Sequence, residues 1–179
     1  MEFRDAMLAR HSCRAYTDRP VDERELGMVL EAANAAPIGR RRYENVHLTV
    51  IRDKALLREI TENARRVMGD PEADPLYGAP VMILVSVREE EGQIRPVNIA
   101  NAACVVENMH LAAADLGLGS CYLWGAIQTI QQSFELMYKL RLDEGFWPVS
   151  ALILGCEAEA QPARTPTVKK LELRFLDGE

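Results

Sequence analysis

The sequence lacks the features that mark membrane, secreted and metal-binding proteins. Its longest apolar run, residues 79–87, stops at Arg88, far short of the roughly 20 residues that a membrane-spanning helix requires. No secretory leader is recognisable, so we expect a cytoplasmic protein with free thiols. We predict no metal site, because no zinc-ligand spacing is found among the four cysteines, Cys13, Cys104, Cys121 and Cys156.

Excess positive charge and the common nucleotide-binding motifs are also absent. The formal net charge is -6, which argues against a nucleic-acid partner, because a nucleic-acid binder needs broad positive potential to meet phosphates. The sequence contains neither a GxGxxG after a strand nor a GxxxxGK[ST] motif. The short GLGS stretch at 117–120 is typical of a helix stop, with Gly117 or Gly119 at positive φ.

What the sequence does contain is material for a packed core. Its 179 residues are 48% apolar and 27% charged, which suits one folded domain spanning 1–179 and does not indicate disorder. Hydrophobic periodicity predicts helices at 2–10, 21–37, 53–69, 96–117 and 127–140. Strands are expected at 46–52, 79–87, 119–124 and 148–156, and this order of elements indicates an α+β sandwich. The tail, 171–179, reads as a short strand that pairs with a sheet edge, its own or a partner's.

The run RHSCRAY, residues 10–16, concentrates donors and positive charge in an acidic chain. It follows the first predicted helix, so its side chains enter an extended segment where they can surround one ligand. Arg10 and Arg14 offer guanidinium forks suited to phosphate, and Ser12 adds a hydroxyl. Basic groups near a helix C-terminus are also stabilised by the helix dipole, so the charge alone does not identify a ligand site.

A second basic cluster, APIGRRRYEN at 36–45, follows the second predicted helix. Gly39 would let the backbone approach a ligand closely. Arg40, Arg41 and Arg42 either form a solvated loop or face the same anion as Arg10 and Arg14. The residues alone leave both interpretations open.

Four segments in order resemble the nitroreductase family of FMN-dependent oxidoreductases. They are the stretch from RHSCRAY to APIG at 10–39, YGAPVMILVSV at 77–87, VVENMHLAAADLGLGSCYLWG at 105–125, and LILGCEAEAQPARTP at 152–166. The resemblance covers nearly the whole chain. It implies a sandwich with a mostly antiparallel central sheet flanked by helices, in an intertwined homodimer with FMN between the subunits.

The resemblance also assigns roles to individual residues. Arg10, His11, Ser12 and the late Arg164 would approach the FMN phosphate and ribityl chain, and Arg14 would lie by the pyrimidine edge of the ring. A fixed cation there stabilises the anion that reduced flavin forms on losing its N1 proton. The resemblance places two further groups along the flavin, one of them from the partner subunit: Pro37, Ile38 and Gly39, and Leu123, Trp124 and Gly125.

One departure concerns the loop at 38–45. Many family members have Ser, Asn and a Gln-Pro-Trp after the Ala-Pro turn, where this chain has Ile38 and Gly39 followed by three arginines. An arginine there would contact an acidic substrate, the phosphates of the nicotinamide cofactor, or solvent. The three arginines therefore stay outside the predicted flavin site.

Other chemically active side chains have simpler explanations. His47 and His110 fall within a predicted strand and helix, which is typical of structural histidines. Cys104 and Cys121 are expected to pack as small apolar groups. Cys13 lies inside the basic run, where cations would lower its pKa and open a redox role.

The resemblance implies a reaction in which hydride passes from NAD(P)H through flavin N5 to a small electron-poor acceptor, of the nitroaromatic or quinone type, with ping-pong kinetics. No side chain is then required as an acid or base, because solvent can protonate the product. Two alternatives remain open from the sequence. The chain would bind FMN without turnover, or it would use the same fold for different flavin chemistry.

Overall fold

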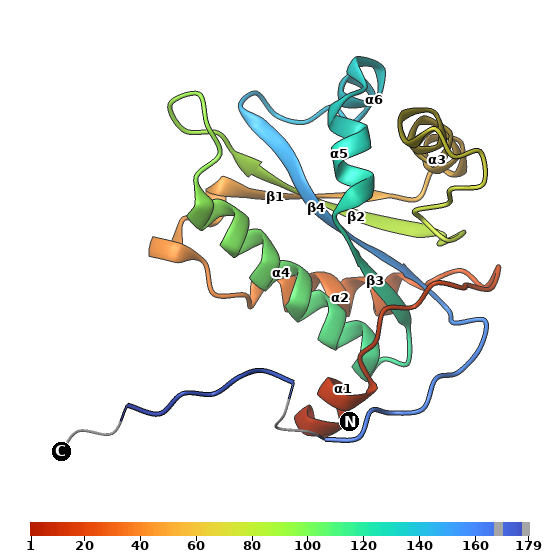
Figure 1. Ribbon diagram of the computed structural model, residues 1–179, viewed down its shortest axis with the longest axis vertical. Coiled ribbons are helices and arrows are strands. Elements are labelled where there is room, and N and C mark those ends of the chain that lie inside the picture. Colours follow the sequence, from red (N-terminus) through yellow and green to blue (C-terminus); the bar gives the residue numbers. More distant parts are fainter. Residues whose placement is uncertain (167–169, 177–179) are drawn as a thin grey trace.

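The computed structural model describes residues 1–166 and 170–176, and it has the expected α+β architecture (Figure 1). Its sheet contains β1 (Val46–Ile51), β2 (Val81–Arg88), β3 (Gly119–Leu123) and β4 (Phe146–Gly155). The strand order is β1-β2-β4-β3, and every pair is antiparallel. The two central strands are buried on both faces, in agreement with their continuous apolar sequences.

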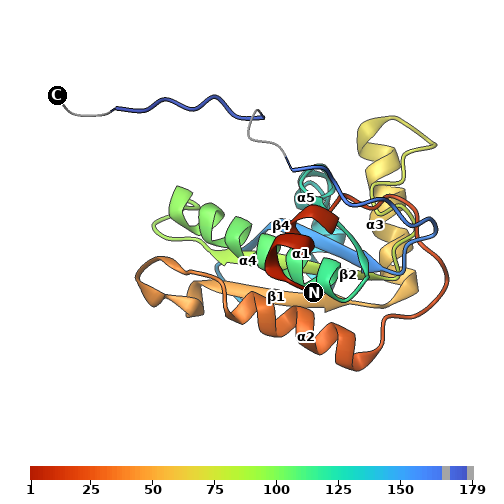
Figure 2. The same ribbon diagram turned by 90° about the horizontal axis from the view of Figure 1, so that it is seen from below.

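Helices cover both faces of the sheet. One face packs on α2 (Glu23–Asn34) and α4 (Pro96–Asp115), and the other packs on α3 (Lys54–Met68), α5 (Gly125–Gln131) and α6 (Phe134–Lys139). The short α1 (Phe3–Ala9) lies beside α4, as Figure 2 shows. Two short 3-10 turns, η1 (Gly39–Arg41) and η2 (Tyr43–Asn45), lead into β1. None of the described helices combines the length and apolar character needed to cross a membrane.

Local capping explains where several helices begin and end. Asp22 and Glu25 form a reciprocal capping box at the start of α2, and Pro96 opens α4 at its first position. Gly117 takes φ +71° just beyond α4, which confirms the predicted helix stop at this residue.

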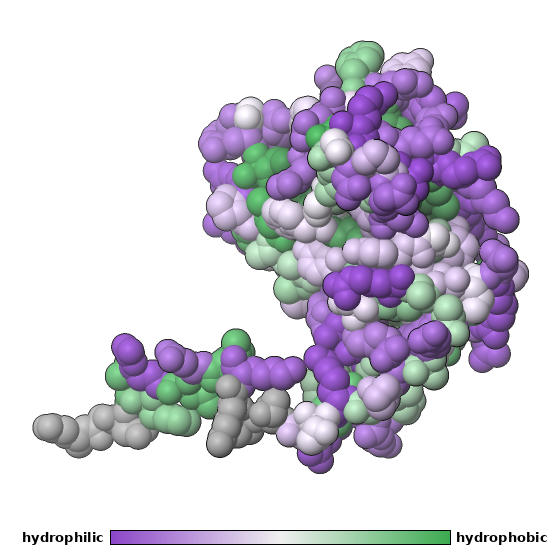
Figure 3. Space-filling view, turned by 45° about the vertical axis from the view of Figure 1, so that its right-hand side comes forward, coloured by the Kyte–Doolittle hydropathy of each residue, from purple (hydrophilic) through white to green (hydrophobic). Residues whose placement is uncertain are grey.

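One helix prediction from the sequence is wrong, and one strand prediction is only partly tested. The helix expected at 127–140 is divided into α5 and α6, because the Ser133 side chain caps a new helix by accepting from Leu136 N–H. The tail predicted as a strand at 171–179 does not pair with the chain's own sheet at 170–176, here called the arm, and 177–179 lie outside the described residues. Pairing with a partner's sheet edge stays a prediction. The arm lies apart from the sheet and exposes apolar side chains (Figure 3).

Candidate functional site

The basic run is extended, as predicted, and is fixed against the edge strand β3. α1 ends at Ala9, and Ser12 forms a parallel bridge with Ser120 of β3. The Cys13 N–H donates to the Ser120 carbonyl at 2.9 Å, and the chain then pairs with the segment that follows β4. These backbone bonds set the directions in which the successive side chains of the run project.

Four of the predicted site residues line one cavity of about 450 Å³: His11, Ser12, Arg14 and Arg164. The Arg14 side chain is exposed, and its Cζ lies 5.9 Å from the centroid of the Tyr77 ring. The neighbouring Tyr77 side chain raises the pKa of the guanidinium, so Arg14 carries a permanent positive charge at the cavity. Tyr77 had no sequence signal beyond its place in the YGAP segment.

Arg10 lies in an adjoining cavity of about 230 Å³ that shares His11 with the first. The Arg10 Nε is 3.9 Å from Glu107 Oε1, a long and weak ion pair. His11 Nδ1 donates to the Ala9 carbonyl at 2.9 Å. Its Nε2 lies 3.1 Å from Glu157 Oε1, an ion-pair distance, although the geometry there is not that of a hydrogen bond.

His110 supports this region from beneath. Its Nε2 lies 3.0 Å from the His11 carbonyl oxygen, and because a carbonyl only accepts, Nε2 must carry the proton. The ring is 2% exposed, and burial lowers the pKa of His110 to about 4, so the ring is neutral at pH 7. His110 therefore acts as the structural histidine predicted from its place in a helix, and it positions the backbone of the basic run.

Lowering the pH from 7 to 4 is expected to destabilise the fold through His110. The unfolded side chain titrates near 6.5 and the folded one near 4, so between these values only the unfolded state binds the proton. The free energy of unfolding should fall by about 3 kcal/mol across that window. His110→Gln keeps an N–H donor for the His11 carbonyl and cannot titrate. Urea denaturation should therefore show a shallower acid slope in the variant, and an unchanged slope would contradict this account.

Arg164 joins the segment after β4 to the end of α1. Its backbone N–H donates to the Leu8 carbonyl at 2.9 Å, and its guanidinium donates to the carbonyls of Met7 and Leu8. These carbonyls belong to the last turn of α1, where helix geometry leaves them without partners. Two of the five guanidinium N–H donors are occupied in this way, and the other three remain for a ligand in the cavity.

The turn at Pro37–Gly39 lies elsewhere. Ile38 is buried in the core beneath α2 and α4, and the Gly39 N–H donates to Asn101 Oδ1 at 3.0 Å. A Cβ at Gly39 would lie 3.1 Å from a Val97 methyl, so the glycine allows close approach to α4, and the expectation that its backbone also approaches a ligand stays a prediction. Asn101 and His110 are nine residues apart on α4, which places their contacts on opposite sides of the helix, roughly 14 Å apart along its axis.

The third predicted group marks the far end of β3. Leu123 is buried, Trp124 is 51% exposed, and Gly125 begins α5. Three residues of extended strand separate Leu123 from Ser120, roughly 10 Å. One chain therefore holds the predicted residues in three separate places, and only the group around 10–14 and 164 shares cavities.

Cys13 does not have the reactive environment that its basic neighbours predict. It is buried, its Sγ donates to the Ala15 carbonyl at 3.2 Å, and burial raises the pKa of its thiol. Cys121 is likewise buried with a raised pKa, as expected of a packed thiol. His47 stacks on Phe146 with ring centroids 3.7 Å apart, which fits a structural role.

Comparisons with known proteins agree with this architecture. The model of the nitroreductase family matches residues 7–156. A protein of Methanothermobacter thermautotrophicus that carries the name NADH dehydrogenase/NAD(P)H nitroreductase is 29% identical over 89% of this chain and 79% of its own length. An FMN reductase [NAD(P)H] of Bacillus subtilis is 28% identical over 87% of this chain and 66% of its own length. A crystal structure of a nitroreductase with bound FMN from Bacteroides fragilis superposes with a TM-score of 0.84 at 27% identity, over 99% of this chain and 100% of that one.

Proposed function

Because this chain belongs to the nitroreductase family, we propose that it is an FMN-dependent oxidoreductase that oxidises NAD(P)H. Both named relatives act with NAD(P)H by their names, and the Bacteroides fragilis protein binds FMN. The proposed acceptor is a small electron-poor molecule, a nitroaromatic or a quinone, reduced in a ping-pong cycle. The proposed catalytic unit is a single domain spanning 1–179.

The observation that carries the proposal is the pair of adjoining cavities around the basic run. A volume of about 450 Å³ lies within the roughly 300–1,000 Å³ typical of cofactor sites. Arg10, Arg14 and Arg164 supply positive charge there, and His11, whose Nε2 faces Glu157 Oε1 at 3.1 Å, lines both cavities. A phosphate dianion attached to a polar chain suits this set of donors.

Each residue of this chain has a proposed task. Arg10, His11, Ser12 and Arg164 hold the phosphate and the ribityl chain, and Arg14 places its charge beside the pyrimidine edge of the ring. Bound FMN supplies the hydride-transfer chemistry. Trp124 is exposed enough to cover one side of a planar ligand. No side chain needs to act as a general acid or base, because the cavity opens to solvent.

The same reasoning favours a homodimer. The Pro37–Gly39 turn lies on the opposite side of α4 from the basic run, so one chain does not bring these groups to one ligand. A second copy would supply the turn to the cavity of the first, in the intertwined arrangement expected from the sequence. The exposed apolar arm is the natural segment to bind across such an interface.

An absorption spectrum of the purified protein tests the proposed function directly. Oxidised FMN should give bands in the visible region, and NAD(P)H should bleach them under anaerobic conditions. Addition of a nitroaromatic or a quinone should restore the colour. A colourless protein that takes up no added FMN would overturn the proposal.

A second candidate is an FMN-binding protein without turnover, and the altered loop at 38–45 is the observation that favours it. Arg40 and Arg41 both have φ +57°, a left-handed conformation that is uncommon for residues other than glycine. Bound flavin that NAD(P)H does not reduce would support this candidate. Reduction without transfer to any nitroaromatic or quinone would favour different flavin chemistry on the same fold.

A further inference from the structure

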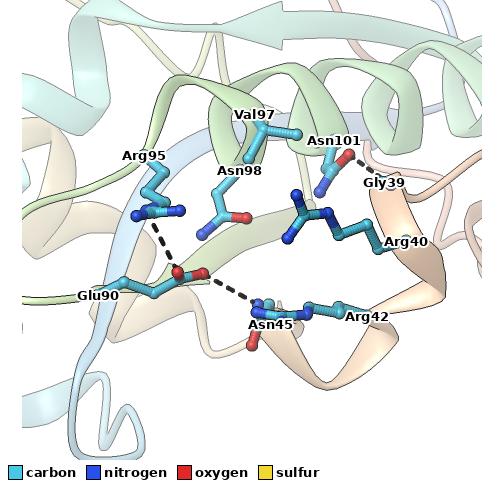
Figure 4. A pocket seen from close by; sticks show the side chains of 9 residues that line it. All are labelled: Gly39, Arg40, Arg42, Asn45, Glu90, Arg95, Val97, Asn98 and Asn101. Carbon is cyan, nitrogen blue, oxygen red and sulfur yellow. Dashed lines mark hydrogen bonds and ion pairs between the residues drawn. The ribbon is translucent and has the colours of Figure 1, made fainter.

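A separate cavity of about 190 Å³ lies at the start of α4, beside the arginine loop (Figure 4). The functional proposal above gives no task to the arginines that line it. Three elements form its walls: the loop at 39–45, the turn at Glu90, and the first two turns of α4. Its lining consists of Gly39, Arg40, Arg42, Asn45, Glu90, Arg95, Val97, Asn98 and Asn101.

The charge in this cavity is strongly positive for an acidic protein. Three guanidinium groups line it, and Glu90 is the only carboxylate among the lining residues. Arg95 is paired with Glu90, with 3.3 Å between Nε and Oε2. Arg40 and Arg42 form no ion pair within the described part of the chain. Two full positive charges therefore remain uncompensated at the cavity.

The amide of Asn101 provides an independent observation. The residue is 6% exposed, and its Oδ1 accepts the Gly39 N–H at 3.0 Å. This bond turns the Nδ2 group the other way, toward the Arg40 guanidinium and the interior of the cavity (Figure 4). Among the described residues nothing accepts a hydrogen bond from that Nδ2. Asn101 Nδ2 is therefore a donor that is open to the cavity beside the two guanidiniums and is available to a ligand there.

The first turn of α4 adds a smaller contribution of the same sign. Arg95 occupies the N-cap position and no side chain caps the helix, so the positive end of the helix dipole faces the cavity region. Asn98 lies one turn before Asn101 on the same side of α4, and its amide is fixed by donation to the Arg88 carbonyl at 3.0 Å. The arginines therefore surround the amide groups of Asn98 and Asn101, which hydrogen bonds hold in place.

We propose that this cavity binds the anionic end group, a carboxylate or a phosphate, of a small-molecule substrate of the enzyme. A volume of about 190 Å³ is below that of pockets that enclose whole drug-sized ligands, so it has room for one end group only. Guanidinium forks bind both oxyanions through paired hydrogen bonds. The inference rests on the proposed function for the identity of the substrate. The group belongs either to the electron acceptor or to the 2′-phosphate of NADPH.

Steady-state kinetics distinguish these two sources. The acceptors are 4-nitrobenzoate and the neutral 4-nitrobenzamide, and the donors are NADPH and NADH. In the R40Q/R42Q variant, kcat/KM should fall by roughly tenfold or more for one of the anionic substrates. The fall is measured for 4-nitrobenzoate relative to 4-nitrobenzamide, and for NADPH relative to NADH. A loss confined to 4-nitrobenzoate assigns the cavity to the acceptor, and a loss confined to NADPH assigns it to the donor. R41Q is the matched control, because Arg41 belongs to the same loop but does not line the cavity.

Calorimetric titration of the purified full-length protein with inorganic phosphate and with benzoate tests the cavity without turnover. Binding that R40Q/R42Q weakens roughly tenfold and R41Q leaves unchanged supports the anion site, even if the protein proves to lack FMN. Equal binding in all three proteins would overturn it. Anion binding without an effect on either kinetic ratio would overturn the substrate assignment. The proposed function fails separately, by the absence of a flavin spectrum.

Discussion

Replacing Leu173 and Phe175 by aspartate is expected to convert the proposed homodimer to a monomer and to release its flavin. Both residues belong to the arm, where Leu171, Leu173 and Phe175 alternate with Glu172 and Arg174. In an extended segment this alternation places the three apolar side chains on one face. All three are more than 60% exposed in the single chain, so the face has no partner there. Two buried carboxylates at an interface would each cost several kcal/mol, enough to separate the subunits.

The opposite face of the arm supplies the control. Glu172→Gln with Arg174→Gln leaves the net charge unchanged and keeps the apolar face, so this double variant should remain a flavin-containing dimer. Sedimentation velocity and the visible spectrum report the two properties in one preparation. A monomeric wild-type protein, or an L173D/F175D variant that stays dimeric, would show that the arm does not join the subunits.

Periodicity and capping predicted most of the fold because both act over a few residues. α4 starts at Pro96, whose ring fixes φ and removes the backbone N–H, and it ends before Gly117, which takes a positive φ. Both properties follow from the residue type alone. The division of the expected helix at 127–140 depends on a competition. The apolar pattern on both sides of Ser133 favours one continuous helix, whereas the Ser133 side chain favours the N-cap of a new helix. The pattern alone does not show that the cap prevails.

The candidate site was less predictable, because its contacts join distant parts of the sequence. The bonds from His110 to His11, from Arg164 to Leu8 and from Gly39 to Asn101 span from 62 to 156 residues. No local pattern encodes such pairs. Asn101 had no sequence signal beyond its place in a buried helix, where a polar side chain is unusual enough to indicate a contact.

The environment of Cys13 shows a related limit. Neighbouring arginines in the sequence predict a lowered thiol pKa, but charge acts through space and through solvent access. In the structure Cys13 is turned into the protein against Gly119, where burial raises the pKa of its thiol more than its hydrogen bond with the Ala15 backbone lowers it. The sequence shows which residues are neighbours along the chain, but it leaves open which side of the segment each side chain occupies.

Replacing Arg14 by methionine is expected to make reduction of the bound flavin harder, lowering its potential by tens of millivolts. Arg14 lines the main cavity and carries a permanent charge, which favours the anionic reduced ring over the neutral oxidised ring. A charge pair about 4 Å apart near a protein surface is worth up to about 4 kcal/mol, and solvent at this exposed side chain reduces that figure. About 1.4 kcal/mol corresponds to 30 mV for a two-electron couple. Methionine keeps much of the length of the arginine stem and removes only the charged fork.

Equilibration with a reference dye under anaerobic conditions measures the potential of each protein. Arg24→Met on α2 removes the same charge from an exposed position outside the described cavities, so its potential should match that of the wild type. Because the effect is electrostatic, Arg14→Lys should recover part of the loss, whereas a purely packing role would give no such recovery. Equal potentials in the wild type and Arg14→Met would place the ring edge away from Arg14, while a lowered potential in both methionine variants would assign the change to overall charge.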